Sequence, residues 1–143
     1  TYAAVMRRWK AGDVLELDLP MPPRRVYSHP RVAANRGRVA LARGPLVYCV
    51  EGADHPGVDL RDVVLPRNAA LGEAPNGAPD GGVAIGAAAG VTPPGSDALY
   101  AHVPSTDRAA PAALTAIPYY AWANRDPGPM HVWLKETING TET

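Results

Sequence analysis

The sequence predicts an all-β fold, an antiparallel β-sandwich of the jelly-roll type with long Ala/Gly/Pro-rich loops. Three observations support this prediction. The 143 residues include 16 prolines and 14 glycines, a composition that favours many turns over long helices. Apolar and polar residues alternate in several short runs, as they do in half-buried strands. No apolar stripe with the 3.6-residue period of a helix extends far enough to indicate a substantial helix.

The clearest strand pair is predicted at residues 37–51. Val39 and Leu41 alternate with Arg38 and small residues in the first half of this stretch. The second half, residues 46–50, is apolar on both faces, which is typical of a strand buried on both sides. Residues 42–45 supply the turn, because glycine tolerates positive φ and proline is accepted at the first position of a strand. We therefore expect this hairpin at the centre of the sheet.

Two further strands are predicted near the N-terminus. Residues 2–9 are strand-like, and residues 10–13 form a turn with glycine at its flexible point. Residues 14–19 give the cleanest alternation in the chain, so we expect their three leucines to face the core while Glu16 and Asp18 face water. These leucines are Leu15, Leu17 and Leu19.

The rest of the chain is less uniform. A short strand is predicted at residues 62–65. Residues 68–97 contain little besides Ala, Gly and Pro, so we expect a flexible loop segment with one or two short strands. Another strand is predicted at residues 99–103. The aromatic residues 114–125 and the apolar residues 130–135 predict a second hairpin.

Composition and charge limit the classes of function. The formal net charge is zero, so electrostatics give no reason to expect a nucleic acid or an acidic membrane surface as partner. No apolar run approaches the eighteen or so residues of a membrane span. The chain opens in a strand-like segment without an initiator methionine, and we interpret residues 1–143 as one β-sandwich region of a longer polypeptide. The compartment, cytoplasmic or secreted, stays open.

Four motifs carry a resemblance to a known family. In chain order they are Arg8-Trp9-Lys10-x-Gly12-Asp13, then Leu19-Pro20-Met21, then Val39-Ala40-Leu41-x-Arg43-Gly44-Pro45-Leu46-Val47-Tyr48-Cys49-x-Glu51, and finally Ile117-Pro118-Tyr119-Tyr120-x-Trp122-x-Asn124-Arg125 with Met130-x-Val132-Trp133-Leu134. Together they resemble the C-terminal part of glycoside hydrolase family 127, the β-L-arabinofuranosidase family. Residues 68–113 have no counterpart in these motifs.

The resemblance implies an accessory role. Members of this family carry catalysis in an (α/α)6 barrel, where a zinc-bound cysteine is the nucleophile and a glutamate is the acid/base, and β-sandwich domains follow that barrel. None of the barrel's motifs is matched here, so the resemblance implies no catalytic residue, no metal ligand and no cofactor in this chain. The implied partners are the upstream barrel of the same polypeptide and, in a homodimer, a second copy.

The chemically reactive side chains favour structural roles. Cys49 lies in an apolar strand and is expected to be a small buried hydrophobe rather than a reactive thiolate. The neighbours Glu51 and Asp54 could act as a carboxylate pair, cap a loop or bind an arginine. The histidines lack the spacing of metal ligands; they are His29, His55, His102 and His131.

The aromatic residues near the C-terminus are the strongest candidates for binding. Flat apolar rings suit the stacking of a sugar, and neighbouring polar side chains suit its hydroxyl groups. The alternative is packing against the core or another domain, because this chain contains no phenylalanine. The candidates for carbohydrate or interdomain contact are Tyr119, Tyr120, Trp122, Asn124, Arg125 and Trp133.

Overall fold

The structure, a computed structural model, describes residues 2–93, 100 and 109–138. Within these residues it contains nine strands and four 3-10 helices of three residues each. The strands are β1 (Pro23–Val26), β2 (Arg38–Arg43), β3 (Leu46–Glu51), β4 (Val63–Pro66), β5 (Leu71–Glu73), β6 (Ile85–Val91), β7 (Ala110–Pro118), β8 (Met130–His131) and β9 (Leu134–Thr137). The 3-10 helices are η1 (Ala33–Asn35), η2 (Gly52–Asp54), η3 (Leu60–Asp62) and η4 (Tyr119–Ala121).

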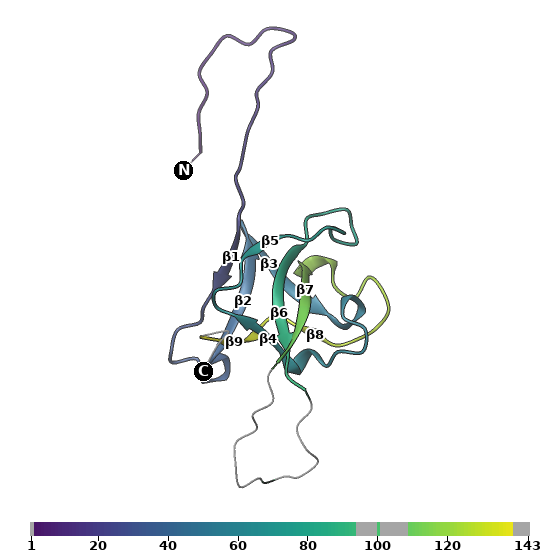
Figure 1. Ribbon diagram of the computed structural model, residues 1–143. Helices are drawn as coiled ribbons and strands as arrows, with labels where there is room; N and C mark the ends of the chain where they lie inside the picture. Colours follow the sequence, from purple (N-terminus) through teal and green to yellow (C-terminus); the bar gives the residue numbers. More distant parts are fainter. Residues whose placement is uncertain (1, 94–99, 101–108, 139–143) are drawn as a thin grey trace.

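Six strands close into a barrel, which forms the compact body in Figure 1. Around the ring they follow the order β2, β9, β4, β6, β7 and β3, and β3 pairs back with β2. The β4–β9 pair is parallel, whereas the other pairs in the ring are antiparallel. The remaining strands pair with single members of the ring: β1 with β2, β5 with β6, and β8 with β3.

The all-β prediction is confirmed, but the sheet is a closed mixed barrel and not the predicted antiparallel jelly-roll sandwich. The difference comes from β9. Its residue Leu134 pairs with Val39 of β2, and its next residue, Lys135, pairs with Val64 of β4. One strand thereby joins two others that are distant in sequence, and closure leaves the ring without long open edges.

The hairpin predicted at residues 37–51 is confirmed as β2 and β3, joined at Gly44 and Pro45. Alternation along β3 sends its side chains into two separate cores. Tyr48 and Val50 belong to the larger cluster, which also includes Leu41 of β2. Cys49 belongs to a second cluster on the other face of the strand, with Ile117, Ala121 and residues of the 74–84 segment. Two-sided burial of β3 therefore requires two cores.

The predicted burial of residues 14–19 is wrong. Residues 2–22, which we call the N-terminal arm, form no strand and extend away from the barrel (Figure 1). The side chains of Leu15, Leu17 and Leu19 are 65%, 75% and 64% exposed. The barrel supplies no surface for them to pack on, so the alternation marks a strand whose apolar face is uncovered in this chain.

The predicted second hairpin is also wrong. β7 ends at Pro118 and η4 follows, so residues 119–125 do not continue the strand. β7 pairs with β6 and β3, β8 pairs with β3, and β9 pairs with β2 and β4. The local apolar pattern indicates which residues form strands, but it does not indicate which strands pair with each other.

Residues 68–93 contain more ordered structure than their composition suggests. β5 and β6 lie there, and β6 is a ring strand that pairs with β7 over seven residues. The predicted strand at 62–65 corresponds to β4. The strand predicted at 99–103 lies outside the described residues apart from Tyr100. None of the described helices has the length and apolar character needed to cross a membrane.

Candidate functional site

The aromatic loop, residues 119–125, displays three large rings at the end of β7. Tyr119, Tyr120 and Trp122 are 45%, 59% and 38% exposed. The rings of Tyr119 and Trp122 have centroids 6.2 Å apart and are tilted by 38° to each other, within the range of a favourable aromatic pair. Tyr119 and Tyr120 lie in η4, whose Ala121 is buried in the second core. The three rings of the loop are therefore partly exposed to solvent, while Ala121 anchors the loop in the second core.

An ion cluster beneath the loop fixes its position. The Arg125 guanidinium donates to both carboxylate oxygens of Asp54 at 2.6 Å and to Glu51 Oε2 at 2.5 Å. The other Glu51 oxygen accepts the backbone N–H of Ala123 at 2.7 Å. Hydrogen bonds to Asp54 first, and then to Glu51, raise the pKa of Arg125 above its usual range. Glu51 and Asp54 are therefore bound to an arginine, one of the three roles left open by the sequence.

His55 connects the same region to the barrel. Its Nε2 accepts the backbone N–H of Thr115 at 3.1 Å, so Nδ1 carries the proton and donates to the Glu51 carbonyl oxygen at 2.8 Å. The side chain is buried. A neutral imidazole thereby bridges β3 and β7. Sequence spacing could exclude His55 as a metal ligand, but its two backbone partners, one of them 60 residues away, could not be found from local pattern.

The structure brings together some of the six candidates and separates others. Tyr119 and Trp122 are paired, and Arg125 belongs to the ion cluster with Glu51 and Asp54. Tyr120 interacts with Asp80, which raises the pKa of the Tyr120 hydroxyl. The backbone N–H of Gly82, followed by Tyr120, lowers the pKa of the Asp80 carboxyl. Trp133 lies elsewhere, between β8 and β9, where its carbonyl oxygen accepts a hydrogen bond from Arg38 at 3.1 Å. Asn124 is exposed, and it precedes Arg125 in the chain.

Cys49 lies in a setting unsuited to nucleophilic chemistry. Its side chain is buried against Ile117 and Ala121. Burial, followed by the negative charges of Glu51 and Asp54, raises the pKa of the thiol to about 12. The group therefore stays protonated at neutral pH, in agreement with the expected role as a small buried hydrophobe.

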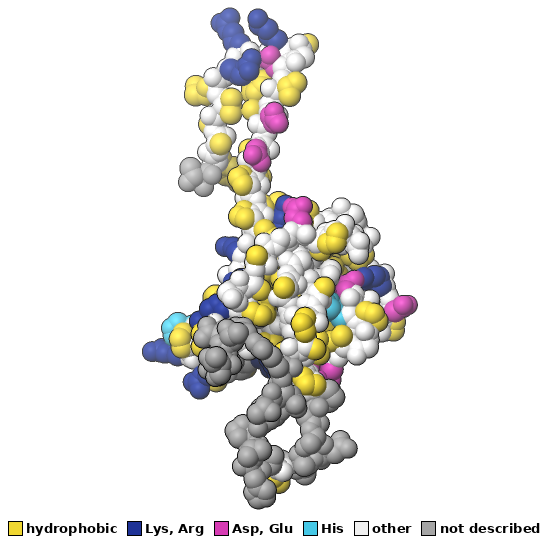
Figure 2. All heavy atoms as spheres, viewed as in Figure 1, with side chains coloured by type: hydrophobic (Ala, Val, Ile, Leu, Met, Phe, Trp, Pro, Cys, Tyr) yellow, Lys and Arg dark blue, Asp and Glu magenta, His cyan; other side chains and the backbone are white. Residues whose placement is uncertain are grey.

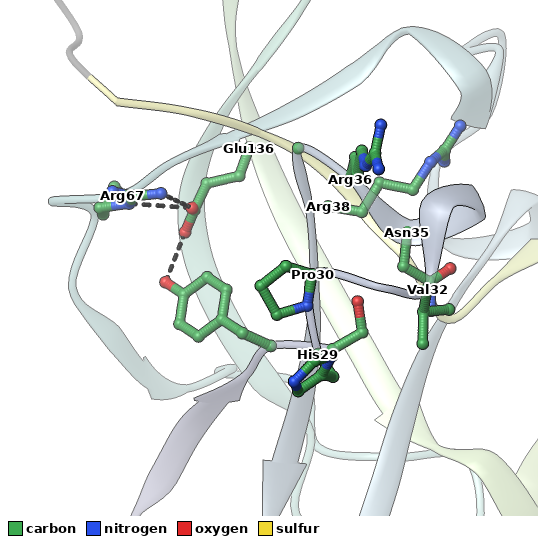
Figure 3. Close-up of a pocket in the computed structure, with 11 residues that line it drawn as sticks. His29, Pro30, Val32, Asn35, Arg36, Arg38, Arg67 and Glu136 are labelled. Atoms are coloured by element: carbon green, nitrogen blue, oxygen red, sulfur yellow. Dashed lines mark hydrogen bonds and ion pairs between the residues drawn. The ribbon is translucent and has the colours of Figure 1, made fainter.

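A polar pocket that the sequence did not reveal lies beside β9 (Figure 3). Its volume is about 210 Å³, and none of the six candidates lines it. Glu136 accepts hydrogen bonds from the Tyr27 hydroxyl at 2.7 Å and from the Arg67 guanidinium at 2.8 and 2.9 Å. Figure 3 marks the contacts between Glu136 and Arg67 with dashed lines. The side chain of Glu136 is 3% exposed, and Arg25 lies 3.7 Å away on the same carboxylate. Tyr27, Arg67 and Glu136 are far apart in sequence, so no local motif indicates the pocket.

The chemistry available in the pocket is that of ion pairing. Glycoside hydrolysis by the usual route needs two carboxyl groups on either side of the scissile bond. Glu136 is the one carboxylate among the pocket's lining residues, and it is held by an arginine and a tyrosine. Arg36 and Arg38 add positive charge to the rim. The arrangement stabilises the junction of β9 with the segments before β2 and after β4.

The family resemblance assigns its zinc ion to the upstream barrel and not to this chain. Within the residues that the structure describes, no group of three or more His, Cys, Asp and Glu side chains is placed to hold a metal ion. The single cysteine is buried and protonated.

Comparison with known proteins identifies the barrel. Residues 23–135 match the family model described as the glycoside hydrolase family 127 C-terminal domain. The chain is 40% identical over 138 residues to a non-reducing end β-L-arabinofuranosidase of Bifidobacterium longum subsp. longum, and the match covers 86% of this chain and 20% of that protein.

Solved structures agree with this assignment. A GH127 β-L-arabinofuranosidase from Geobacillus stearothermophilus T6 superposes with a TM-score of 0.72 at 42% identity, covering 82% of this chain and 19% of that one. A second GH127 β-arabinofuranosidase superposes with a TM-score of 0.65 at 32% identity, covering 85% and 18%. The chain spans about a fifth of the length of these relatives. This chain therefore belongs to the family of glycoside hydrolase family 127 C-terminal domains.

Proposed function

We propose that this chain is the non-catalytic accessory domain of a β-L-arabinofuranosidase-like glycoside hydrolase. Its role is to support the upstream (α/α)6 catalytic barrel or to mediate contacts between two copies of the enzyme. The observation that carries the proposal is the family match over residues 23–135, in a chain that spans about a fifth of its relatives. The carboxylates of Glu51, Asp54 and Glu136 are each paired with an arginine, which supports a structural role for them.

The experiment compares the 143-residue chain with the full-length enzyme that contains it. Hydrolysis of p-nitrophenyl β-L-arabinofuranoside is measured for both proteins. We expect turnover by the full-length enzyme and none above the blank for the isolated chain. Hydrolysis by the isolated chain would overturn the accessory role, and an inactive full-length enzyme would overturn the assignment of its substrate. Light scattering of the full-length enzyme distinguishes a monomer from a homodimer.

A second function, carbohydrate binding, is favoured by the aromatic loop. The exposed rings of Tyr119 and Trp122 form a pair on a backbone that the Arg125 ion cluster holds in place. A rigid aromatic surface loses little conformational entropy when a ligand stacks on it. This arrangement supports binding of the arabinose-containing chains on which the parent enzyme would act.

The binding function is tested by titrating the isolated chain with L-arabinose and β-linked arabino-oligosaccharides while following backbone amide NMR shifts. Saturable shifts at residues 119–125, lost in Trp122→Ala and retained in Trp9→Ala, would support it. Trp9 is a matched control because it is an exposed tryptophan on the distant N-terminal arm. Absence of shifts at millimolar sugar would assign the rings to contact with another domain.

A further inference from the structure

The N-terminal arm carries an apolar surface that the barrel leaves uncovered. Residues 2–22 extend from the barrel as two legs joined by a turn, and apolar side chains line both legs (Figures 1 and 2). Met6 is 96% exposed and Leu17 75% exposed. So many large apolar side chains on one short segment are costly in water and mark an interaction surface.

The turn at the tip joins the two legs as a hairpin. The backbone N–H of Asp13 donates to the Lys10 carbonyl oxygen at 3.1 Å, and the Asp13 carboxylate accepts the Lys10 N–H at 2.8 Å. Two residues, Ala11 and Gly12, therefore form the connection. Gly12 has a φ of +89°, whereas Ala11 has no positive φ, which is the pattern of a type II turn. Such a turn matches the twist of paired strands less well than a type I′ or II′ turn does, and residues 2–22 form no ladder in this chain by itself.

The turn also determines which side chains share a face. In a hairpin ladder that continues from the Lys10–Asp13 pair, Met6 lies opposite Leu17 and Ala4 lies opposite Leu19. Leu15 lies on this same face because side chains alternate along a strand. The opposite face carries Glu16 and Asp18, with Arg7 across from Glu16 and Val5 across from Asp18, and it also carries Trp9 and Val14 beside the turn. Pairing the legs would therefore gather the three leucines and Met6 on one face, with Arg8 across from Leu15, and place both carboxylates of the second leg on the other face.

The base of the arm is attached to the barrel. Met21 packs against Gly44 in the β2–β3 turn, close enough that an added Cβ at Gly44 would collide with it. Arg24 donates to the Gly44 carbonyl oxygen at 2.9 Å. The arm therefore leaves the barrel from a defined point, ahead of residues 23–135 that constitute the family domain.

We propose that the N-terminal arm is a β-hairpin that adds to the edge of a β-sheet in the part of the parent polypeptide that precedes this chain, with Met6, Leu15, Leu17 and Leu19 covering the core of that sheet. Main-chain hydrogen bonds to the sheet edge would supply the ladder that the type II turn does not, and the alternating leucines would supply apolar burial. The inference rests on the proposed function, because it requires a longer parent enzyme.

A second copy of this barrel is a poorer host for the arm. The described strands outside the closed ring are β1, β5 and β8, which have four, three and two residues. Each leg offers an extended run of about six residues, at roughly 3.3 Å per residue, so these edges are too short to pair with it. The relatives that contain this domain are about five times its length and have room for another sheet.

The first test is hydrogen–deuterium exchange of the full-length enzyme and of the 143-residue chain. We expect the amides of residues 4–9 and 14–19 to exchange at least about 100-fold more slowly in the full-length enzyme than in the isolated chain. Equal, rapid exchange in both proteins would overturn the inference. The readout does not depend on turnover, so it holds even if the full-length enzyme acts on another substrate.

The second test uses two substitutions on opposite faces of one leg. Leu17→Asp is expected to lower the melting temperature of the full-length enzyme by about 2–5 °C while leaving that of the isolated chain unchanged. Asp18→Asn, the matched control, is expected to change neither. Equal effects of the two substitutions would overturn the inference. So would an isolated chain that is dimeric by light scattering and becomes monomeric in Leu17→Asp, since the arm would then bind a second copy.

Discussion

The guanidinium of Arg125 lies 2.5 Å from a carboxylate oxygen of Glu51, a residue 74 positions earlier in the chain. The contact joins the end of β3 to the aromatic loop that follows β7. Asp54 completes the cluster from η2, where it meets the same guanidinium. The loop therefore owes its conformation to charges that come from another part of the sequence.

Removing Arg125 should destabilise the domain strongly. Glu51 is 8% exposed at its side chain, so Arg125→Met would leave a buried carboxylate without its partner. We expect a loss of about 2–4 kcal/mol in the free energy of unfolding, measured by urea titration. Arg61→Met is the control, because its pair with Asp59 is solvent-exposed and such pairs contribute little to stability. Equal losses would contradict a special role for the Arg125 cluster.

Replacing Ala123 by glycine should leave the stability of the domain unchanged or increase it. Its φ of +59° is the one positive value among the described non-glycine residues, and its N–H is bound by Glu51. A left-handed conformation costs alanine roughly 1 kcal/mol, which glycine avoids at an entropic cost of about 0.4–1 kcal/mol in the unfolded state. Ala123→Gly should thus change the melting temperature little or raise it. A β-branched residue at the same position, in Ala123→Val, should lower it.

Cys49 makes a contribution to the pH dependence of stability. Its pKa is about 12 in the folded chain, compared with 9.0 for an unperturbed thiol. Between these values the unfolded chain releases the proton and the folded chain keeps it, so the stabilisation is complete below pH 9 and falls as pH rises through this window. Urea titrations at pH 7 and pH 10 should show a smaller decrease for Cys49→Ala than for the unchanged protein.

The protonated state of Cys49 also predicts its reactivity. Ellman's reagent at pH 8 should modify the thiol slowly in the folded chain and rapidly in concentrated urea, because the thiolate is the reactive form. Rapid modification without denaturant would mean that the second core opens readily.

Gly44 tests how the arm is attached to the barrel. Gly44 and Gly37 both have positive φ values, +55° and +67°, so alanine is strained at either position. Only at Gly44 would the new Cβ meet the side chain of Met21, while nothing lies within 4 Å at Gly37. Gly44→Ala should therefore cost about 1 kcal/mol more than Gly37→Ala, measured by thermal unfolding. Equal costs would show that Met21 does not pack there in solution.

Local pattern predicted those strands whose partners are close in sequence. The hairpin of β2 and β3 was located correctly because its turn, its alternation and its two apolar faces all lie within residues 37–51. The same reasoning failed for residues 14–19. Their alternation indicates an apolar strand face correctly, but it contains no information on whether the surface that covers that face belongs to this chain.

The candidate site was predicted in part for a similar reason. Aromatic residues at 119–122 were recognisable as unusual, and an arginine partner for Glu51 and Asp54 was foreseen as one alternative. That the arginine is Arg125, and that His55 binds Thr115, depends on segments more than 50 residues apart that are brought together by β3 and β7.

The sequence by itself determined the class of structure and the family, because β-sheet periodicity, turn residues and ordered motifs are local properties of the chain. Only the tertiary structure decided that the sheet closes as a barrel, since closure depends on β9 pairing with both β2 and β4. It also decided the environment of each polar group. Glu51 and Glu136 are the same residue type, and the sequence does not distinguish their roles. In the structure Glu51 binds the aromatic loop, whereas Glu136 joins β9 to Tyr27 and Arg67.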